Sequence, residues 1–111
     1  MPNVNKVVLI GHLGKDPESN QVGENSVCKF SLAVSEKYKQ ETVTEWFDVE
    51  CWGNTGSFVQ KYLGKGDAIY LEGKIKTDTW KDKEGNIRKS TKIVGFTVQG
   101  LTGKKDNEPN F

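Results

Sequence analysis

The sequence predicts a small all-β domain with one short helix, and three observations support this fold class. The chain has 111 residues, a length that suits one domain with a modest core. Hydrophobic residues make up only 34% of the chain, whereas aromatic residues reach 10% and glycine occurs 12 times, a balance typical of short strands joined by turns. Several segments also alternate apolar and polar residues with the period of a half-buried strand.

Three strands are expected in the first half of the chain. Residues 4–13 form the first strand, which is apolar on both sides at its centre, and residues 14–25 form a turn and a polar loop. Residues 27–35 form the second strand, whose predicted core side chains are Cys28, Phe30, Leu32 and Val34. A charged, flexible connection at residues 36–43 leads to the third strand at residues 44–52.

The second half begins with a helix and continues with two strands. Gly53, Asn54 and Thr55 supply N-cap chemistry, and Gly64 ends the helix. The apolar stripe of this helix consists of Phe58, Val59, Tyr62 and Leu63. The fourth strand, residues 67–76, is expected to bury Ile69, Leu71 and Ile75. A long hairpin at residues 77–91 turns at residues 84–86, and the fifth strand, residues 92–101, is expected to bury Val94, Phe96 and Val98.

This order of elements is that of an oligonucleotide/oligosaccharide-binding (OB) barrel. Such a barrel has five strands, and here the predicted helix lies between strands 3 and 4. The long hairpin is expected to project between strands 4 and 5. Residues 1–103 therefore form the predicted OB domain, and residues 104–111 form a short polar tail without a core pattern.

The sequence argues against several classes of protein and site. No stretch approaches the roughly 18 apolar residues of a membrane span, and no leader precedes the first strand, so we expect a cytoplasmic protein. Cys28 and Cys51 could pair, but buried free thiols are the expectation for a chain without a leader. One histidine and no Cys-x-x-Cys spacing predict neither a metal site nor a cofactor. His12 has no partnering nucleophile and P-loop spacing is lacking, so we expect no enzyme.

The third strand carries the most informative pattern in the chain. Because side chains alternate along a strand, its core face holds Phe47, Val49 and Cys51, and its outward face holds Trp46, Asp48, Glu50 and Trp52. Two indoles that face solvent are candidates for stacking on nucleobases. The alternative is ordinary packing of the indoles, under the hairpin or in a subunit contact.

Aromatic and basic residues occur together in the predicted hairpin. The net formal charge of the chain is only +1, but six basic and three acidic residues lie between positions 76 and 92, around Trp80. With Tyr38, Trp46 and Trp52, this residue would provide aromatic platforms along one extended path. Lysines beside the path would hold the phosphates of a single strand, so the pattern predicts a surface that binds single-stranded nucleic acid.

Two carboxylates complicate this predicted surface. Asp48 and Glu50 lie between the two indoles of the third strand, and carboxylates repel phosphates. Lys29 and Lys74 are the neighbours expected to pair with them and are included in the predicted DNA-binding surface. The alternative for the basic stretch is a solvated hairpin without a ligand.

Several segments resemble the bacterial single-stranded DNA-binding proteins of the SSB type. They are residues 5–18 (NKVVLIGHLGKDPE), 44–46 (TEW), 62–66 (YLGKG) and 69–75 (IYLEGKI), and Trp80 followed by Lys81, Asp82 and Gly85. The resemblance runs from about residue 4 to residue 100. It implies a nucleoid-associated OB-fold protein that assembles as a homotetramer, a dimer of dimers. Such a protein coats single-stranded DNA without sequence specificity during DNA replication, recombination and repair.

The resemblance also implies which residues bind DNA. The stacking aromatics would be Tyr38, Trp46, Trp52 and Trp80. Basic groups near the phosphates would be Lys6, Lys65, Lys76 and Arg88. With the two lysines named above, the predicted DNA-binding set is Lys6, Lys29, Tyr38, Trp46, Trp52, Lys65, Lys74, Lys76, Trp80 and Arg88.

Three features depart from the family pattern. Phe47 stands where a histidine often lies at the subunit interface, and Asp48 stands at a position that is frequently basic. Residues 106–111, which end at Phe111, resemble a shortened form of the acidic tip that recruits replication and repair proteins. The tail is therefore expected to be either a short recruiting segment or a disordered stub.

Two other functions remain open from the sequence. One is a primosome-type OB dimer with a small DNA site, which assists helicase loading. The other is a structural interaction protein whose exposed aromatics dock a protein partner. Binding of single-stranded DNA separates the second from the predicted function, and stoichiometry separates the first.

Overall fold

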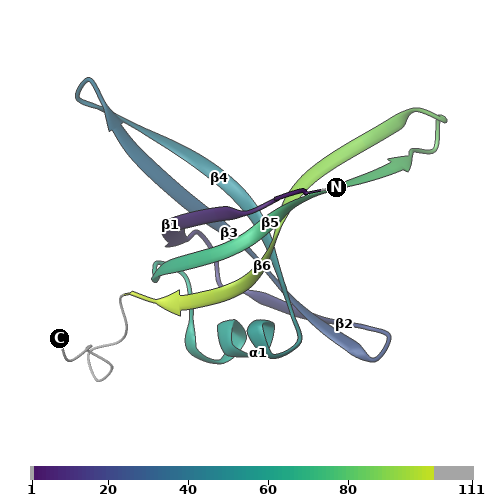
Figure 1. Ribbon diagram of the computed structural model, residues 1–111, viewed down its shortest axis with the longest axis horizontal. Helices are drawn as coiled ribbons and strands as arrows, with labels where there is room; N and C mark the ends of the chain where they lie inside the picture. The colour runs from purple at the N-terminus through teal and green to yellow at the C-terminus, as the bar shows by residue number, and fades with distance from the viewer. Residues whose placement is uncertain (1, 102–111) are drawn as a thin grey trace.

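The computed structural model of the protein describes residues 2–101, so the predicted tail at residues 104–111 lies outside it. Within the described residues there are six strands and one helix (Figure 1): β1 (Val7–Leu13), β2 (Glu18–Val22), β3 (Asn25–Tyr38), β4 (Glu41–Trp52), α1 (Gly53–Tyr62), β5 (Ala68–Lys81) and β6 (Ile87–Gly100). The predicted all-β class with one short helix is confirmed. No helix in residues 2–101 has the length and apolar character needed to cross a membrane.

Five of the strands close into a barrel. The strand order is β1-β5-β6-β4-β3-β2, and an additional pairing of β1 with β3 joins the two sides of the sheet. Strand β2 lies outside this ring because it pairs only with β3. The polar loop expected at residues 14–25 was therefore wrong over Glu18–Val22. Its five side chains are all exposed, so it lacks the apolar alternation that reveals a strand. Counting β2, the helix lies between strands 4 and 5, not between strands 3 and 4.

Two long hairpins project from the barrel and diverge (Figure 1). The β5–β6 arm remains paired out to Lys81 and Ile87, as the predicted projecting hairpin requires. The β3–β4 arm remains paired out to Tyr38 and Glu41. The flexible connection expected at residues 36–43 was therefore wrong. Its two turn residues both have positive φ, 50° at residue 39 and 71° at residue 40, the backbone that a two-residue hairpin turn requires.

The barrel interior is apolar and closed at one end by α1. Leu32, Cys51, Ile69 and Leu71 are fully buried within it. Cys28 and Cys51 are register partners on β3 and β4, and both are free and buried, as predicted. Burial raises the pKa of the Cys51 thiol to about 12, so this group is an inert core residue.

The helix matches its prediction only in part. Val59 is buried and Leu63 is partly buried against the core, whereas the Phe58 and Tyr62 rings are exposed and lie 5.3 Å apart. The expected side-chain N-cap is absent, because the N-cap position is Trp52 and no side chain there bonds the first turn.

A bulge changes which residues of β6 face the core. Glu72 pairs with Thr97 and Gly73 pairs with Gly95, so Phe96 is an extra residue on β6. Ile93 and Gly95 are buried before the bulge, and the Phe96 side chain is 55% exposed. The predicted burial of Phe96 was therefore wrong, because regular alternation does not continue through a bulge.

Truncation of Phe96 should confirm this assignment. We expect Phe96→Ala to change the free energy of unfolding by less than about 0.5 kcal/mol, because its ring is mostly in solvent. Leu71→Ala, a control in the core, should cost about 2–5 kcal/mol. Urea unfolding measures both values. A loss for Phe96→Ala as large as the loss for Leu71→Ala would place the ring in the core and contradict the bulge.

Candidate nucleic-acid interface

Strand β4 presents its tryptophans to solvent, as the alternation predicted. Val49 and Cys51 are 1% and 0% exposed, and their neighbours Trp46 and Trp52 are 62% and 39% exposed. Burial of the core side chains thus determines which face of β4 turns toward the solvent. Two indoles are left open on the barrel wall as a consequence.

The Trp46 indole is held in place by a close contact with the loop after β1. A Cβ atom on Gly14 would lie only 2.4 Å from Cζ3 of Trp46, so only glycine fits beneath the ring. The Gly14 N–H donates a hydrogen bond to the Ser31 carbonyl, which anchors this loop on β3. The ring is therefore supported by backbone on one side, and more than half of the side chain remains exposed.

The other two predicted platforms lie on the arms. Tyr38 is 64% exposed near the tip of the β3–β4 arm, where the Lys39 Nζ lies 5.5 Å from the centre of its ring. Trp80 is 49% exposed on the β5–β6 arm, opposite Arg88. All four predicted aromatic residues are thus accessible, on β4 and on both arms.

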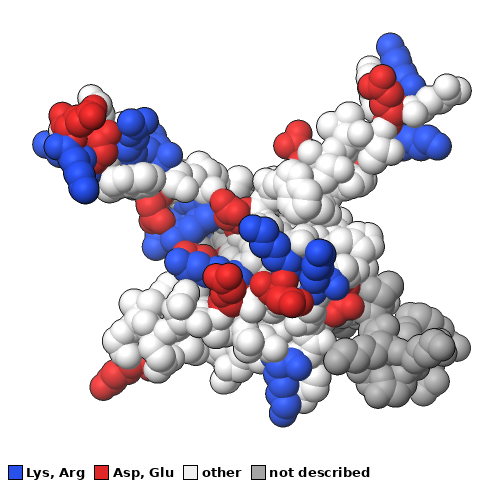
Figure 2. Space-filling view, turned by 180° about the vertical axis from the view of Figure 1, so that it is seen from behind, with Lys and Arg blue, Asp and Glu red and all other residues white. Residues whose placement is uncertain are grey.

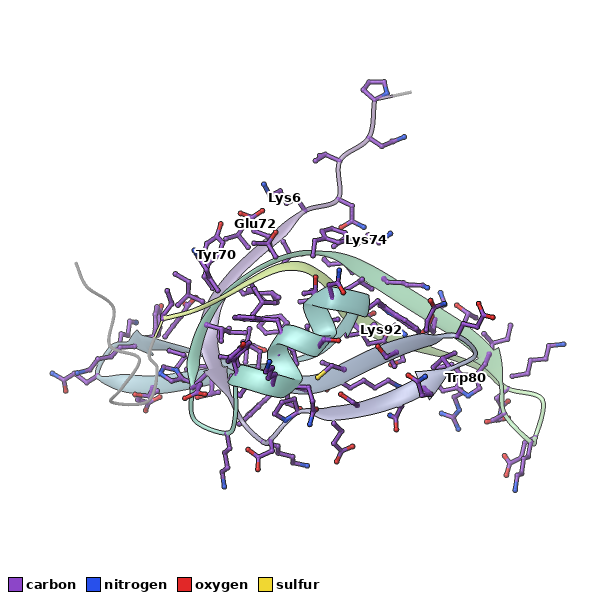
Figure 3. All side chains as sticks on the ribbon, turned by 90° about the horizontal axis from the view of Figure 1, so that it is seen from below. Lys6, Tyr70, Glu72, Lys74, Trp80 and Lys92 are labelled. Atoms are coloured by element: carbon purple, nitrogen blue, oxygen red, sulfur yellow. The ribbon has the colours of Figure 1, made fainter. Side chains whose placement is uncertain are left out.

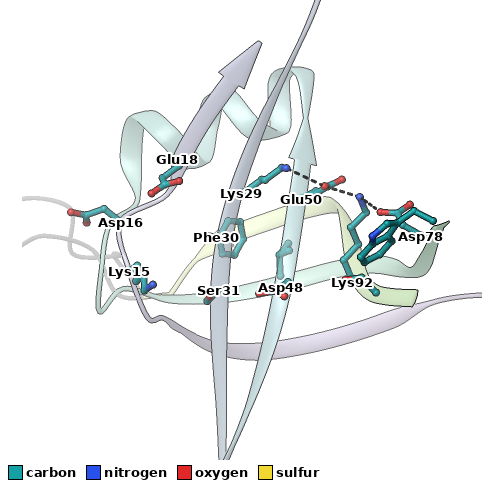
Figure 4. A pocket seen from close by; sticks show the side chains of 13 residues that line it. Lys15, Asp16, Glu18, Lys29, Phe30, Ser31, Asp48, Glu50, Asp78 and Lys92 are labelled. Carbon is teal, nitrogen blue, oxygen red and sulfur yellow. Dashed lines mark hydrogen bonds and ion pairs between the residues drawn. The ribbon is translucent and has the colours of Figure 1, made fainter. Parts of the chain in front are cut away.

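Two cavities open beside these rings. One, of about 490 Å³, is bordered by Trp80 on the β5–β6 arm, by outward residues of β3 and β4, and by the segment around Asp16 (Figure 4). The other, of about 290 Å³, is bordered by Trp46, Phe47 and Ile75. The four exposed aromatics therefore do not form one flat stripe. Two of them border hollows at the base of the arms.

A charge network around the buried Glu50 forms part of the wall of the larger cavity. Glu50 is only 8% exposed, and the Lys92 Nζ lies 2.7 Å from its carboxylate and 2.7 Å from that of Asp78 (Figure 4). Lys29 lies 3.8 Å from Glu50, so the predicted pairing with Lys29 is confirmed. Lys74 takes no part in this network, because β6 lies between β4 and β5.

The network shifts the pKa values of its members. Hydrogen bonds to Asp78 and then Glu50 raise the pKa of the Lys92 ammonium. The hydrogen bond from Lys92 is the largest cause that lowers the pKa of the Asp78 carboxyl. Lys92 was not among the predicted site residues. Only the strand order, which places β6 beside β4, identifies it as the partner of Glu50.

Lys6 lies on a different side of the barrel. Its Nζ is 3.6 Å from the Glu72 carboxylate, which also accepts a hydrogen bond from the Tyr70 hydroxyl. This bond lowers the pKa of the Glu72 carboxyl and raises that of the Tyr70 hydroxyl. Figure 3 shows Lys6, Tyr70 and Glu72 together on one side of the ribbon, away from Trp80.

Arg88 forms an ion pair with a carboxylate of its own arm, the β5–β6 hairpin. Its Nε lies 2.9 Å from the Asp82 carboxylate, which also accepts hydrogen bonds from the backbone N–H groups of Glu84 and Asn86. The Asn86 N–H is the largest of several causes that lower the pKa of the Asp82 carboxyl. Arg88 therefore braces the turn of the β5–β6 arm and stands opposite Trp80.

The predicted basic residues do not form one positive stripe. Lys65, Lys74 and Lys76 are exposed and have no salt bridge within residues 2–101, whereas Lys6 and Lys29 each face a carboxylate. Figure 2 shows acidic and basic side chains interspersed over the face it presents. In the part of the chain that the structure describes, no cluster of three or more His, Cys, Asp or Glu residues could hold a metal ion.

Comparison with known proteins agrees with this geometry. The model of the single-strand binding protein family matches residues 4–101. The chain belongs to this family. Membership of this family agrees with the predicted surface for single strands.

Individual relatives support the assignment. The chain is 40% identical to single-stranded DNA-binding protein 1 of Chlorobaculum tepidum over 94% of this chain and 68% of that protein. It is 35% identical to single-stranded DNA-binding protein 1 of Synechocystis sp. over 95% of this chain and 89% of that protein. Its fold matches the Plasmodium falciparum SSB, solved in a complex with ssDNA, with a TM-score of 0.82 and 26% identity over 92% of this chain and 98% of that chain.

Removal of Lys92 should test the charge network. Lys92→Met leaves the buried Glu50 with only the longer contact to Lys29, so we expect a loss of about 1–3 kcal/mol in the free energy of unfolding. The double variant Lys92→Met/Glu50→Gln should lose less than the single variant, because no buried charge is stranded. Urea unfolding of the variants gives the coupling energy. Additive losses would show that the two residues are not coupled.

Proposed function

We propose that this protein coats single-stranded DNA without overall sequence specificity during DNA replication, recombination and repair. The observation that carries the proposal is the set of exposed aromatic rings on β4 and the two arms, with Trp46 and Trp80 bordering cavities at the base of the arms. Exposed apolar surface beside a groove is typical of a binding site for a ligand.

Stacking supplies the sequence-tolerant part of the affinity. Every base has a π face, and in proteins of this class, the SSB family included, each stacked base is worth about 1–3 kcal/mol. Trp46 is the best-placed platform, because Gly14 fixes its ring without covering it. Trp80 and Tyr38 extend the path along the two arms. Trp52, the last residue of β4, provides the fourth platform.

Phosphate contacts fall to the lysines that have no internal salt bridge. Of the predicted DNA-binding residues, Lys65, Lys74 and Lys76 are in this position within the described residues, whereas Lys6, Lys29 and Arg88 would exchange an existing carboxylate partner for a phosphate. We expect binding to weaken as salt is added, with a slope of about 0.7 for each phosphate neutralised.

The edge of β1 supports assembly as a homotetramer. Strand β1 pairs with β5 from Val7 to His12 but with β3 only at His12 and Leu13, so most of its second edge is open. Val8 and Ile10 are 52% and 58% exposed on this strand. An open apolar edge is suited to pairing with a second copy of the chain. Two such dimers joined back to back complete the proposed tetramer.

Recruitment of replication and repair proteins through the tail ending at Phe111 stays a prediction.

The stacking proposal predicts a large loss of affinity for one pair of substitutions. Trp46→Ala combined with Trp80→Ala should weaken binding of oligo(dT) by about 2–6 kcal/mol, at about 1–3 kcal/mol for each base. Titration of intrinsic fluorescence measures the wild type, and labelled DNA measures the variants. Tyr62→Ala, which removes an equally exposed ring on α1, is the matched control. Unchanged affinity in the double variant would refute the stacking assignment, and a wild type that binds no DNA would favour the protein-docking alternative.

The assembly proposal predicts the mass in solution. Native mass spectrometry or light scattering should give four chains for the wild type and fewer for Ile10→Lys, because a charge then faces the proposed contact. Val22→Lys adds the same charge to an exposed position on β2 and should leave the mass unchanged. A wild-type dimer with a short DNA site would instead support the primosome-type alternative.

A further inference from the structure

We infer that Asp48 recognises the Watson–Crick edge of guanine and so adds a base preference to otherwise sequence-tolerant binding. This inference rests on the proposed function, because it assigns a role within the same DNA path. It concerns one residue whose place in the fold, charge and neighbours set it apart from the other carboxylates of the site.

Asp48 lies where the two arms diverge. The parallel pairing of β4 with β6 spans Val49 to Cys51, so Asp48 is the first residue of β4 outside this pairing, on the side of the arm. Its side chain borders both cavities, the one that contains Trp46 and the one that contains Trp80. Asp48 is the residue that the linings of both cavities share, so it lies between the two indoles on which a single strand would stack.

The Asp48 carboxylate is available to a ligand, unlike its neighbours. Glu50 and Asp78 are both held by Lys92, whereas Asp48 has no salt bridge or side-chain hydrogen bond within residues 2–101. Its register partner on β3 is Ser31, a small neutral residue that cannot neutralise it. The residue is exposed and lies in the lining of the larger cavity, where Figure 4 labels it, so its acceptor oxygens are free for a ligand.

The charge of the larger cavity favours base edges over phosphates. Its lining includes five carboxylate residues and only three lysines: Asp16, Glu18, Asp48, Glu50 and Asp78, with Lys15, Lys29 and Lys92. Phosphates are repelled by this excess of negative charge, whereas N–H groups of bases are attracted. A strand that passes the cavity should accordingly turn its bases inward and its backbone outward.

Among the bases, guanine matches a carboxylate best. An ionised carboxylate only accepts hydrogen bonds, and its two oxygens suit a pair of parallel donors. Guanine presents two adjacent donors, N1–H and the 2-amino group, on an edge that is open in a single strand. Thymine and cytosine each place a carbonyl or ring-nitrogen acceptor beside their donor, which a carboxylate repels. Asp48 therefore distinguishes guanine from the pyrimidines.

The test compares two alternating oligonucleotides in lithium buffer, oligo(dT-dG) and oligo(dT-dI), in which inosine lacks only the 2-amino group. The wild type should bind the guanine strand at least about fivefold more tightly, the effect of one well-formed carboxylate–base pair. Asp48→Asn should abolish this ratio while binding oligo(dT) as tightly as the wild type or more tightly. Glu18→Gln removes the same charge from the same cavity and should keep the ratio.

Each outcome decides a different point. Equal binding of the two alternating strands by the wild type would overturn the inference and leave the proposed function intact. A ratio that persists in Asp48→Asn, or that Glu18→Gln also abolishes, would overturn the assignment to Asp48. Uniform tightening of all strands in Asp48→Asn, with no change in the ratio, would show that the carboxylate acts only by repelling phosphates. Absence of binding to every oligonucleotide would instead refute the proposed function.

Discussion

The register between β3 and β4 decides what this protein presents to solvent. The two strands pair continuously from Val27 and Trp52 to Tyr38 and Glu41. Because side chains alternate, burial of Val49 and Cys51 in the barrel obliges the two indoles of β4 to face outward. A slip by one residue would exchange the two faces, and core packing strongly opposes this exchange. The same strand pairing that buries the core residues of β4 therefore also exposes its two indoles.

Several charged side chains of the site form ion pairs with one another within the barrel wall and the β5–β6 arm. Lys92 satisfies two carboxylates at 2.7 Å each, and Arg88 braces the turn of its arm through Asp82. Such internal pairing holds Lys6, Lys29, Arg88 and Lys92 on carboxylates, and the other lysines within residues 2–101 have no salt bridge. Aromatic stacking and phosphate contacts of these unpaired lysines then share the affinity for DNA. The mixed charges over the face in Figure 2 agree with this division of roles.

Sequence pattern revealed the core strands and the exposed indoles because burial imposes alternation on residues such as Val49 and Trp46. It missed β2, whose side chains are all exposed although its backbone pairs with β3 along its whole length. It read the β3–β4 arm as a flexible loop because Lys39 and Gln40 replace the usual Asn-Gly of a two-residue turn. The bulge at residue 96 and the pairing of Glu50 with Lys92 depend on strand pairing across the barrel, which local periodicity does not contain.

The most direct test of the account observes the indoles themselves. With 15N-labelled protein, the three Nε1–H signals of the tryptophans can be assigned by single Trp→Phe variants and followed while a short oligo(dT) is added. Because bases stack on their rings, the signals of Trp46 and Trp80 should move or broaden first and most strongly. DNA that binds and shifts backbone signals elsewhere, while these indole signals stay unchanged, would contradict stacking on the two tryptophans.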